Sequence, residues 1–367
     1  MHILQFLSSS AFHGAEAMAA ELVKQLAALG ATVDIAVLDN DGRGNDEIFE
    51  AVGAAAAATH RIPASGKFDL STLRALKRIK SSRGIDLVHS HKYKSTFYAT
   101  FARTRTSRLV TTYHNWLYDT RSLRVYAAVD KAFARFNDVC IAVSSPVATE
   151  LRRHVDPRDV LQIDNGVDIE RYRPRISRED AKVSLGLSPQ RLLVGFVGRL
   201  SPEKGLFFLL DAVRSLAHLE FDVVIVGDGE LRPALQSWID AAGMADKIRL
   251  LGNRRDTPAI YTALDVLVLP SLEEAFPMVV LEAMAAGCAV VASEVGEVGR
   301  IVRHGVDGEL VPAGQVVALR DAIERLLGDG ARRHGLGLSA QVRVESNFSS
   351  RSMAASYLRA YESAMRD

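Results

Sequence analysis

The sequence predicts an α/β protein with two doubly wound domains, each built on a parallel sheet with helices on both faces. Three observations predict this class. Short apolar runs alternate with amphipathic helical patterns along most of the chain, as they do in βαβ units. The alternation breaks at Arg173-Pro174 and restarts with the apolar run at 192–197. With 367 residues, the chain is too long for one ordinary core and suits two.

In the first half of the chain, the apolar runs predict strands that end in turn or polar residues. These strands span 3–7, 32–38, 86–89, 108–113, 139–144 and 160–163. Helical spacing predicts helices between them, at 15–29, 69–82, 94–103, 123–136 and 146–154. The Ala-rich segment between 39 and 68 predicts no defined element.

The second half repeats this rhythm. Its strands are expected at 192–197, 223–226, 248–251, 266–269, 289–292 and 309–311. Helices are expected after the turns at 198–205 and 227–230, from about Pro277, and from Val316 onward.

The last stretch, 350–367, predicts a helix that returns to the first domain. Met353, Tyr357 and Tyr361 share one face of it. We therefore expect one domain at 1–168 together with 350–367, and a second at 169–349. Because ligands of open parallel sheets bind outside the carboxyl ends of the strands, two such domains would face each other across a cleft that holds the site.

The composition is that of a soluble globular protein, with 48% hydrophobic and 24% charged residues and a net charge of +1. Cys140 and Cys288 lie in apolar runs and predict buried, reduced thiols. No run reaches the roughly 18 apolar residues of a membrane span, and the N-terminus does not resemble a signal peptide. We expect a cytoplasmic protein, and attachment to the inner face of the cytoplasmic membrane stays open.

Residues 67–135 hold a concentrated positive charge, with 15 Lys and Arg against four Asp and Glu. Such a surplus predicts an anionic partner, either a membrane surface or a phosphorylated substrate. A solvated basic face would give the same pattern, and charge alone leaves nucleic acid open.

The stretch 270–287 contains a helix start, because Pro277 suits the first helical position. Free backbone N–H groups at such a start, together with the helix dipole, attract anions. The amides that would serve belong to Phe276, Met278 and Val279.

Two carboxylates flank this helix start. Glu274 precedes it and Glu282 lies about a turn and a half inside it, so the two acids cannot share one task. A nucleotide sugar carries a diphosphate for the helix end, with vicinal hydroxyls on its ribose and its hexose for the two acids. An acidic loop followed by an ordinary helical Glu would give the same pattern.

Other candidate residues follow the predicted strand ends. Arg199 and Lys204 would give a diphosphate leaving group fixed positive charge, so we expect no metal ion. His114 could orient or shuttle a proton, or bond a sugar hydroxyl. Trp116 and Tyr118 could stack on a sugar ring. The alternatives are solvated cations, a structural His and aromatic filling of the core.

Several nucleotide-binding and transfer signatures are incomplete. No segment completes GxGxxG after a strand, which weakens a dehydrogenase hypothesis, and no GxxxxGK[ST] loop is present, which excludes a P-loop ATPase. Asp39-Asn40-Asp41 matches the DxD pattern of metal-chelating glycosyl transfer. We discount this match because three residues at a strand exit fit the pattern by chance very often.

A series of motifs runs in order along the whole chain. They are HGAE at 13–16, TTYH at 111–114, NGVD at 165–168, GFVGRLSPEKG at 195–205, GDGE at 227–230 and the EX7E pair Glu274 and Glu282. Their order and spacing resemble the retaining glycosyltransferases with the GT-B fold, in particular family 4 of the glycosyltransferase classification (glycosyl transferases group 1). The resemblance implies two Rossmann-like domains, the first binding the acceptor and the second the nucleotide-sugar donor.

The resemblance also implies roles for matching residues. Arg199 and Lys204 would bind the diphosphate, Glu282 the ribose and Glu274 the transferred sugar, while His114 would contact that sugar near its reacting carbon. The implied catalytic residues are His114, Glu274, Arg199 and Lys204. The implied donor site comprises Gly14, Gly198, Arg199, Lys204, Gly227, Glu230, Leu251, Glu274, Ala275, Phe276, Pro277, Met278, Val279 and Glu282. The implied acceptor side comprises His13, Trp116 and Tyr118.

The implied reaction moves a hexose-type sugar from an NDP-sugar, with UDP the expected base, to a glycan or to a lipid-linked anionic acceptor. It would retain the anomeric configuration by front-face attack, without cofactor or metal, in polysaccharide or envelope assembly. No nucleic-acid partner is expected. The alternatives are an NDP-sugar 2-epimerase of the same architecture and a non-catalytic nucleotide-binding protein.

Three positions depart from the family pattern. His13 replaces the first Gly of the usual GGAE turn, Ala275 replaces the usual Gly after the first acid, and Arg300 stands where Glu is frequent. None removes an implied cation or acid, so the departures bear on which donor fits.

Overall fold

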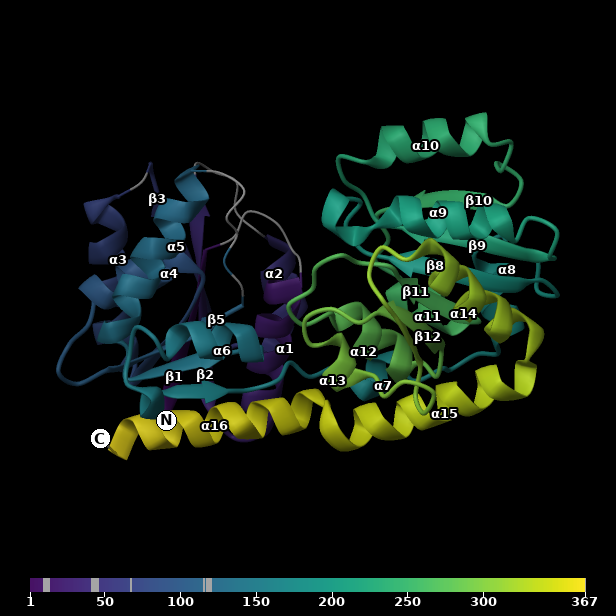
Figure 1. Cartoon of the computed structure of the whole chain (residues 1–367). Helices are drawn as coiled ribbons and strands as arrows, with labels where there is room; N and C mark the ends of the chain where they lie inside the picture. The colour runs from purple at the N-terminus through teal and green to yellow at the C-terminus, as the bar shows by residue number, and fades with distance from the viewer. Residues whose placement is uncertain (9–13, 41–45, 67, 115, 117–120, 367) are drawn as a thin grey trace. The chain divides into compact units, whose positions relative to one another are not determined.

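The computed structural model describes residues 1–8, 14–40, 46–66, 68–114, 116 and 121–366, with the backbone alone at 40 and 121–123. It forms two compact units: unit 1 comprises Met1–Gly166 with Ser350–Asp367, and unit 2 comprises Val167–Ser349. The first division falls after Gly166, two residues before the expected boundary. Each unit is a parallel sheet flanked by helices (Figure 1), which confirms the predicted α/β class with two doubly wound sheets.

The described residues of unit 1 form a seven-stranded sheet in the order β3-β2-β1-β4-β5-β6-β7. The strands are β1 His2–Ser8, β2 Thr32–Asn40, β3 Ala58–Ala64, β4 Leu87–His91, β5 Arg108–Tyr113, β6 Val139–Ala142 and β7 Val160–Gln162. The helices are α1 Gly14–Ala28, α2 Asp46–Val52, α3 Leu70–Arg83, α4 Tyr93–Phe101, α5 Arg121–Phe133, α6 Ser145–Leu151 and α16 Ser350–Arg366, with short 3-10 turns at Gly53–Ala55, Ala134–Phe136 and Pro157–Asp159. The core that includes α1, α2 and α16 is separate from the core that includes α3 and α4.

Two elements of unit 1 lie in the Ala-rich segment where none was predicted. Helix α2 has only seven residues, and β3 lies at the edge of the sheet, where β2 is its one partner among the described strands. Most residues of β3 are exposed or half-buried, and Pro63 interrupts its sequence pattern. The strand therefore depends on its pairing with β2 more than on its own residues.

The described residues of unit 2 form a six-stranded sheet in the order β10-β9-β8-β11-β12-β13. The strands are β8 Leu192–Val197, β9 Phe221–Val226, β10 Ile248–Gly252, β11 Val266–Leu269, β12 Ala289–Ser293 and β13 Glu309–Val311. The helices are α7 Ile169–Tyr172, α8 Arg178–Ser184, α9 Leu206–Ser215, α10 Arg232–Ala241, α11 Thr257–Ala263, α12 Met278–Ala285, α13 Val298–Ile301, α14 Val316–Gly328 and α15 Gly330–Asn347, with a 3-10 turn at Pro202–Lys204. Buried side chains of both faces form the largest core of the protein.

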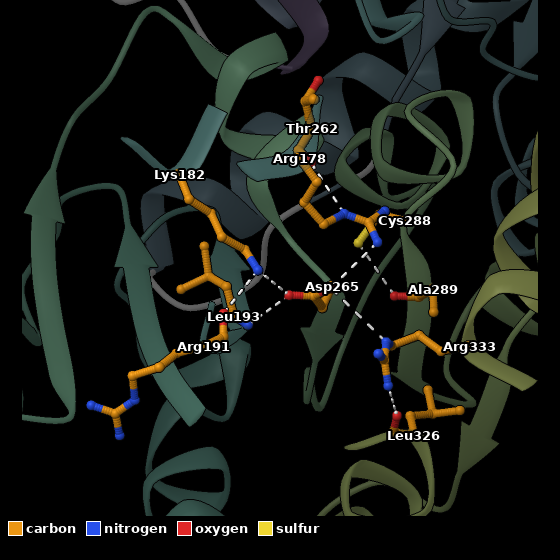
Figure 2. Close-up of polar contacts among 10 residues, drawn as sticks. All are labelled: Arg178, Lys182, Arg191, Leu193, Thr262, Asp265, Cys288, Ala289, Leu326 and Arg333. Atoms are coloured by element: carbon orange, nitrogen blue, oxygen red, sulfur yellow. Dashed lines mark hydrogen bonds and ion pairs between the residues drawn. The ribbon is translucent and has the colours of Figure 1, made fainter. Parts of the chain in front are cut away.

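Asp265, the residue before β11, is a buried hub of unit 2 (Figure 2). Its carboxylate accepts hydrogen bonds from Lys182 Nζ at 2.7 Å and from the backbone N–H of Leu193 at 2.8 Å. Arg178 donates at 3.3 Å, and Arg333 Nε lies 3.9 Å away. These contacts tie α8 and α15 to the amino end of β11, which is the sheet edge opposite the carboxyl ends of the strands.

The terminal helix α16 packs on unit 1, as its apolar face predicted. Tyr357 and Tyr361 are fully buried in the same core as α1. Cys140 and Cys288 are both buried and unpaired, also as predicted, and burial raises the pKa of each thiol to about 12. Within the described ranges, no helix combines the length and the apolar character needed to cross a membrane.

Candidate functional site

The loops that follow β8, β9 and β11 pack against one another at the carboxyl edge of the unit 2 sheet. The backbone N–H of Leu200 donates to the carbonyl of Asp228 at 2.9 Å. The backbone N–H of Leu272 donates to the carbonyl of Glu203 at 2.8 Å. Loops that start far apart in sequence are therefore joined by their own backbones at the edge where ligands of such sheets bind.

Two glycines make this close packing possible. Gly227 has φ of 129°, and a Cβ there would lie 1.9 Å from the carbonyl oxygen of Gly198. Gly296 has φ of 53°, and a Cβ there would lie 1.8 Å from the carbonyl oxygen of Glu274. Any side chain would push these loops apart. The predicted donor-site residues Gly198 and Gly227 thus have at least a packing role.

The predicted cation Lys204 and the predicted acid Glu274 are in direct contact. Lys204 Nζ lies 2.6 Å from Glu274 Oε1, and Ser271 donates its hydroxyl to the same oxygen at 2.8 Å. The side chains of Lys204 and Glu274 are 19% and 8% exposed. A largely buried, charge-assisted pair of this kind holds both groups in one orientation.

The other predicted cation, Arg199, lies differently. Its guanidinium donates to Glu203 Oε1 at 2.6 Å, and its side chain is 61% exposed. Ser201 also donates to Glu203 Oε1, at 2.7 Å. Burial opposes ionisation of Glu203, but these hydrogen bonds outweigh it and hold the pKa of that carboxyl below its usual value. Arg199 is therefore paired at the surface, whereas Lys204 is paired inside.

Helix α12 starts at Met278, and Pro277 is its N-cap rather than its first residue as predicted. Pro277 has ψ of 102°, which is extended, so the chain turns into the helix one residue later. Phe276 and Pro277 are buried, while Met278 and Val279 are half-buried in the first turn of α12. The helix start itself, from which the anion site was inferred, is present.

Glu282 lies in α12 and has a different environment from Glu274. The hydroxyl of Tyr261 donates to Glu282 Oε2 at 2.6 Å, and Tyr172 also hydrogen-bonds this carboxylate. Burial raises the pKa of Glu282, and the two tyrosine hydrogen bonds only partly offset that rise. The two acids of the EX7E pair are thus held separately, one by a lysine and one by tyrosines.

Ala275 and Arg300, two positions that depart from the family pattern, both contact Glu297. The carbonyl of Ala275 accepts from the backbone N–H of Glu297 at 3.3 Å. Arg300 forms an ion pair with the buried carboxylate of Glu297, and its guanidinium lies 5.9 Å from the centre of the Phe276 ring. Arg300 therefore neutralises a buried acid and covers Phe276.

Glu230 and Leu251 lie at the carboxyl ends of the neighbouring strands β9 and β10. Glu230 is exposed and Leu251 is half-buried. The backbone N–H of Gly227 donates to the carbonyl of Gly252 at 2.8 Å, which joins the two loops. The structure places these donor-site predictions on the same sheet edge as Glu274.

In unit 1, His114 follows β5 and lies beside His91, the last residue of β4. His91 Nδ1 and His114 Nε2 are 3.4 Å apart, and the two rings are stacked. Burial, and to a smaller extent the nearby Lys92 ammonium, lower the pKa of His114 to about 4. The predicted imidazole is therefore neutral at physiological pH.

Gly14 is the first residue of α1, and Glu16 in the same turn is buried and ion-paired with Lys92. Lys92 has φ of 71°, the left-handed region that L-residues rarely adopt, and it is the N-cap of α4. A non-glycine residue held this way is typical of functional sites. His13 lies outside the described residues.

Trp116 is partly buried against its own unit. Its indole N–H donates to Asp130 Oδ2 at 2.9 Å, and its ring lies 5.6 Å from that of Tyr113. Lys131 Nζ lies 4.9 Å from the ring centre. These contacts favour the core-filling alternative over sugar stacking for Trp116. Tyr118 is not among the described residues.

Several residues that hold the predicted groups in place were not themselves predicted. Ser271 and Tyr261 hold the two acids, and no local pattern marks them. Lys92 was counted only as one of many basic residues, and its backbone conformation cannot be read from sequence. Gln5, whose Oε1 lies 2.8 Å from His91 Nε2, could have been found, because it is a polar residue inside the apolar run of β1.

Two family models match the chain. Glycosyltransferase Family 4 matches residues 12–171, and Glycosyl transferases group 1 matches residues 177–343. The chain belongs to the group 1 glycosyltransferases. It is therefore a glycosyltransferase enzyme, and its two parallel sheets are those of the GT-B fold.

Relatives of this glycosyltransferase include enzymes of envelope assembly. It is 29% identical to a lipopolysaccharide core biosynthesis mannosyltransferase of Rhizobium meliloti, over 68% of this chain and 72% of the relative. It is 28% identical to UDP-Gal:alpha-D-GlcNAc-diphosphoundecaprenol alpha-1,3-galactosyltransferase of Escherichia coli, over 71% of each. The crystal structure of Anabaena HepE with UDP-glucose has the same fold, with a TM-score of 0.85, 22% identity, and coverage of 99% of this chain and 100% of that one.

Proposed function

We propose that this glycosyltransferase transfers a hexose-type sugar from UDP to a glycan or lipid-linked anionic acceptor in polysaccharide or envelope assembly, with retention of configuration. The reaction takes place on the inner face of the cytoplasmic membrane. It needs neither a cofactor nor a metal ion.

The observation that carries this proposal is the contact of Lys204 with Glu274. A sugar transferred from a diphosphate has its hydroxyls within a few bonds of the leaving phosphate. An ammonium for the phosphate and a carboxylate for the hydroxyls therefore have to be neighbours. Lys204 and Glu274 meet this requirement from two different loops, and Ser271 fixes the carboxylate further.

The remaining contacts extend the same donor. The first-turn amides of α12, at Met278 and Val279, face a diphosphate with the positive end of the helix dipole. Glu282, whose carboxylate is oriented by Tyr261, accepts the ribose hydroxyls. Arg199, exposed in its pair with Glu203, turns to the diphosphate when the donor arrives.

Retention follows a front-face course in this proposal. The bond between the anomeric carbon and the phosphate oxygen breaks, and the acceptor hydroxyl attacks from the same face. The acceptor proton passes to the leaving phosphate oxygen, so UDP departs and no enzymic nucleophile is needed. Lys204 stabilises the charge that develops on that oxygen.

Support for the substrate class comes from the relatives. One relative acts in lipopolysaccharide core biosynthesis, and another uses UDP-galactose with a diphosphoundecaprenol acceptor. A structure of the same fold is a complex with UDP-glucose. UDP and an envelope acceptor are therefore the first substrates to test.

The test is a panel of UDP-, GDP- and ADP-linked hexoses, with release of the nucleoside diphosphate followed with and without acceptor. We expect release with a UDP-hexose, stimulated by acceptor. Release of nucleotide only from GDP- or ADP-sugars, and not from UDP-sugars, would contradict the proposal that UDP is the base of the donor. Conversion of the sugar without release of nucleotide would instead establish the 2-epimerase alternative, and nucleotide binding without turnover would establish a binding protein.

A second observation supports the membrane part of the proposal. Five rings of unit 1 form a connected phenylalanine cluster, with neighbouring centroids between 4.9 and 5.8 Å apart. Its members are Phe68, Phe97, Phe101, Phe133 and Phe136. Three of them are about half exposed, at 50%, 50% and 46% for Phe68, Phe101 and Phe136.

This phenylalanine cluster lies within the basic segment 67–135 and next to its end. Exposed aromatic rings in a segment rich in Lys and Arg fit the interface of an anionic bilayer, where rings enter the headgroup region and cations bind the lipid charge. Separate solvated cations would not need exposed rings beside them. We therefore assign the surface of α4 and α5 to the membrane.

Vesicle co-sedimentation tests this assignment. The protein should bind vesicles containing phosphatidylglycerol at low salt and not vesicles of phosphatidylcholine alone. Replacing Phe68, Phe101 and Phe136 by Ser should weaken binding. The matched control replaces the exposed residues Val317, Leu338 and Val342 of unit 2 by Ser and should leave binding unchanged. No binding to anionic vesicles at low salt would end the membrane proposal.

A further inference from the structure

A chain of hydrogen bonds runs through the interior of unit 1 from α16 to His114. Tyr361 of α16 has its hydroxyl 2.6 Å from His89 Nδ1 and accepts from Gln5 Nε2 at 3.2 Å. Gln5 Oε1 lies 2.8 Å from His91 Nε2. His91 Nδ1 lies 3.4 Å from His114 Nε2. Gln5, His89, His91 and Tyr361 are all at most 1% exposed, so these groups satisfy one another rather than water.

Gln5 gives this chain a direction. An imidazole or a hydroxyl can donate or accept at the same atom, but an amide donates only from its nitrogen and accepts only at its oxygen. Gln5 Oε1 therefore accepts from His91 Nε2–H. His91 is neutral, because burial lowers its pKa well below the usual value, so its Nδ1 carries the lone pair. His114 then donates to it from Nε2.

The other branch agrees with this direction. Tyr361 accepts from Gln5 and so donates its own proton to His89 Nδ1. His89 Nε2–H then donates to Thr112 Oγ1 at 2.8 Å. Rotating the amide of Gln5 by half a turn would reverse every one of these bonds. The tautomer of His114 is thus coupled to one buried amide on β1.

We propose that Gln5 and His91 are positioning residues for transfer, which hold neutral His114 with its proton on Nε2 and its lone pair on Nδ1. His114 then meets a substrate hydroxyl as a hydrogen-bond acceptor. This inference rests on the proposed function through the role of His114 at the sugar. The tautomer itself can be measured without any substrate.

The test is a long-range proton–nitrogen correlation spectrum of the full chain labelled with ¹⁵N-histidine. Loss of signals in His114→Gln assigns the His114 ring. In the wild type, Nε2 should be the protonated nitrogen and Nδ1 the unprotonated one. A proton on Nδ1 of His114 in the wild type would overturn the proposal.

Two matched variants at the same buried position extend the test. Gln5→Glu keeps an oxygen that accepts from His91 Nε2–H, so the tautomer of His114 should stay, while the Tyr361 hydroxyl, which no longer receives a proton from an amide, donates to the second carboxylate oxygen. Gln5→Met keeps the length of the side chain but removes the acceptor. A buried N–H without a partner costs more than a bare lone pair, so His91 should move its proton to Nδ1 and donate to His114. The His114 proton should then shift to Nδ1, and an unchanged tautomer in Gln5→Met would overturn the proposal.

Transfer kinetics separate positioning from packing. Gln5→Met should lower kcat by about fivefold to tenfold, the range of one neutral hydrogen bond, with KM for the donor little changed. Gln5→Glu should restore kcat. If Gln5 had only a packing role, both variants would change the melting temperature, and Gln5→Glu would not have a higher kcat than Gln5→Met. Full activity of His114→Gln would overturn the proposal, because transfer would then not depend on the group that Gln5 and His91 position, whereas it would leave the proposed sugar transfer itself intact.

Discussion

Lys204 Nζ lies 2.6 Å from Glu274 Oε1 although the two residues are 70 positions apart in sequence. One follows β8 and the other follows β11, so the contact exists only because these strands are neighbours in the sheet. It joins the cation expected to bind the phosphate to the acid expected to bind the sugar.

Lys204→Met and Glu274→Gln should each reduce the transfer rate by at least about 100-fold. The first removes the ammonium that stabilises the charge on the leaving phosphate, and the second removes the carboxylate that accepts from the hydroxyls of the transferred sugar. Both changes conserve size, so circular dichroism should show an intact fold. The measurement is kcat/KM with the best donor of the panel. Wild-type activity in either variant would contradict the site.

A matched control is available in the same unit. Lys182 forms a similar buried pair with Asp265, at 2.7 Å, on the opposite edge of the sheet. Lys182→Met should destabilise unit 2 by about 3–5 kcal/mol, since it leaves a buried carboxylate short of a partner. Activity per folded molecule should not change. If Lys182→Met lost transfer activity to the same extent as Lys204→Met, the loss in Lys204→Met could not be attributed to the missing ammonium beside Glu274.

Glu282→Gln should raise the stability of the fold and weaken binding of the donor. Because burial raises the pKa of Glu282 in the folded protein, its ionisation costs folding free energy that accumulates as the pH rises from the unfolded-state pKa through the folded-state pKa. The cost is absent in acid, where the carboxyl is protonated in both states. The variant should therefore melt higher than wild type at pH 8 and equally at pH 4. Its donor KM should rise, because an amide is a weaker acceptor for ribose hydroxyls. A melting difference that is larger at pH 4 would contradict the assigned shift.

Unit 1 should lose stability on mild acidification. Burial lowers the pKa of His89 to about 3 and of His114 to about 4, from an ordinary value of 6.5, and lowers that of His91 as well. Below pH 6.5 the unfolded chain takes up protons that the folded chain refuses. Each histidine then removes about 1.4 kcal/mol per pH unit until the pH reaches its folded pKa.

Denaturant unfolding between pH 7.5 and 5 measures this slope. His89→Gln removes one of the three groups and should make the slope shallower, whatever its effect on stability at pH 7.5. An equal or steeper slope in the variant would show that His89 does not titrate in this way.

Transfer should survive chelation. In the proposed reaction Lys204, Arg199 and the first turn of α12 supply the positive charge that a divalent cation supplies in metal-dependent enzymes. The protein is first stripped of bound metal. Its transfer activity should then be the same with and without EDTA, and added Mg²⁺ or Mn²⁺ should not raise that activity. Loss of activity in EDTA that returns with one of these ions would refute metal independence.

Most of the fold could be predicted because its signals are local. The apolar runs at 3–7, 108–113 and 192–197 became β1, β5 and β8 with bounds that differ by at most one residue. The apolar face of α16 predicted its return to unit 1. Helix α2 and strand β3 could not be predicted, because β3 gains its hydrogen bonds from β2 and has little apolar character of its own.

The candidate site also has a part that could be predicted from the sequence and a part that could not. Residue types and spacing identified Glu274, Glu282, Arg199 and Lys204, and they placed each at a strand end or helix start. Their pairing was not predictable: Lys204 turned out to contact Glu274, whereas Arg199 is held by its near neighbour Glu203. Which cation meets which acid depends on the order of the strands in the sheet.

The sequence by itself determined that this chain has two α/β units, where their strands end, and that its residues match a glycosyltransferase family. These properties depend on periodicity and on the order of motifs, which are local. The tertiary structure alone decided that Lys204 meets Glu274 and that Gln5, His91 and Tyr361 join β1, β4 and α16 into one chain ending at His114. A hydrogen bond between distant residues forms only when donor and acceptor lie within a few tenths of an ångström of the right separation, and only the packed backbone sets that separation.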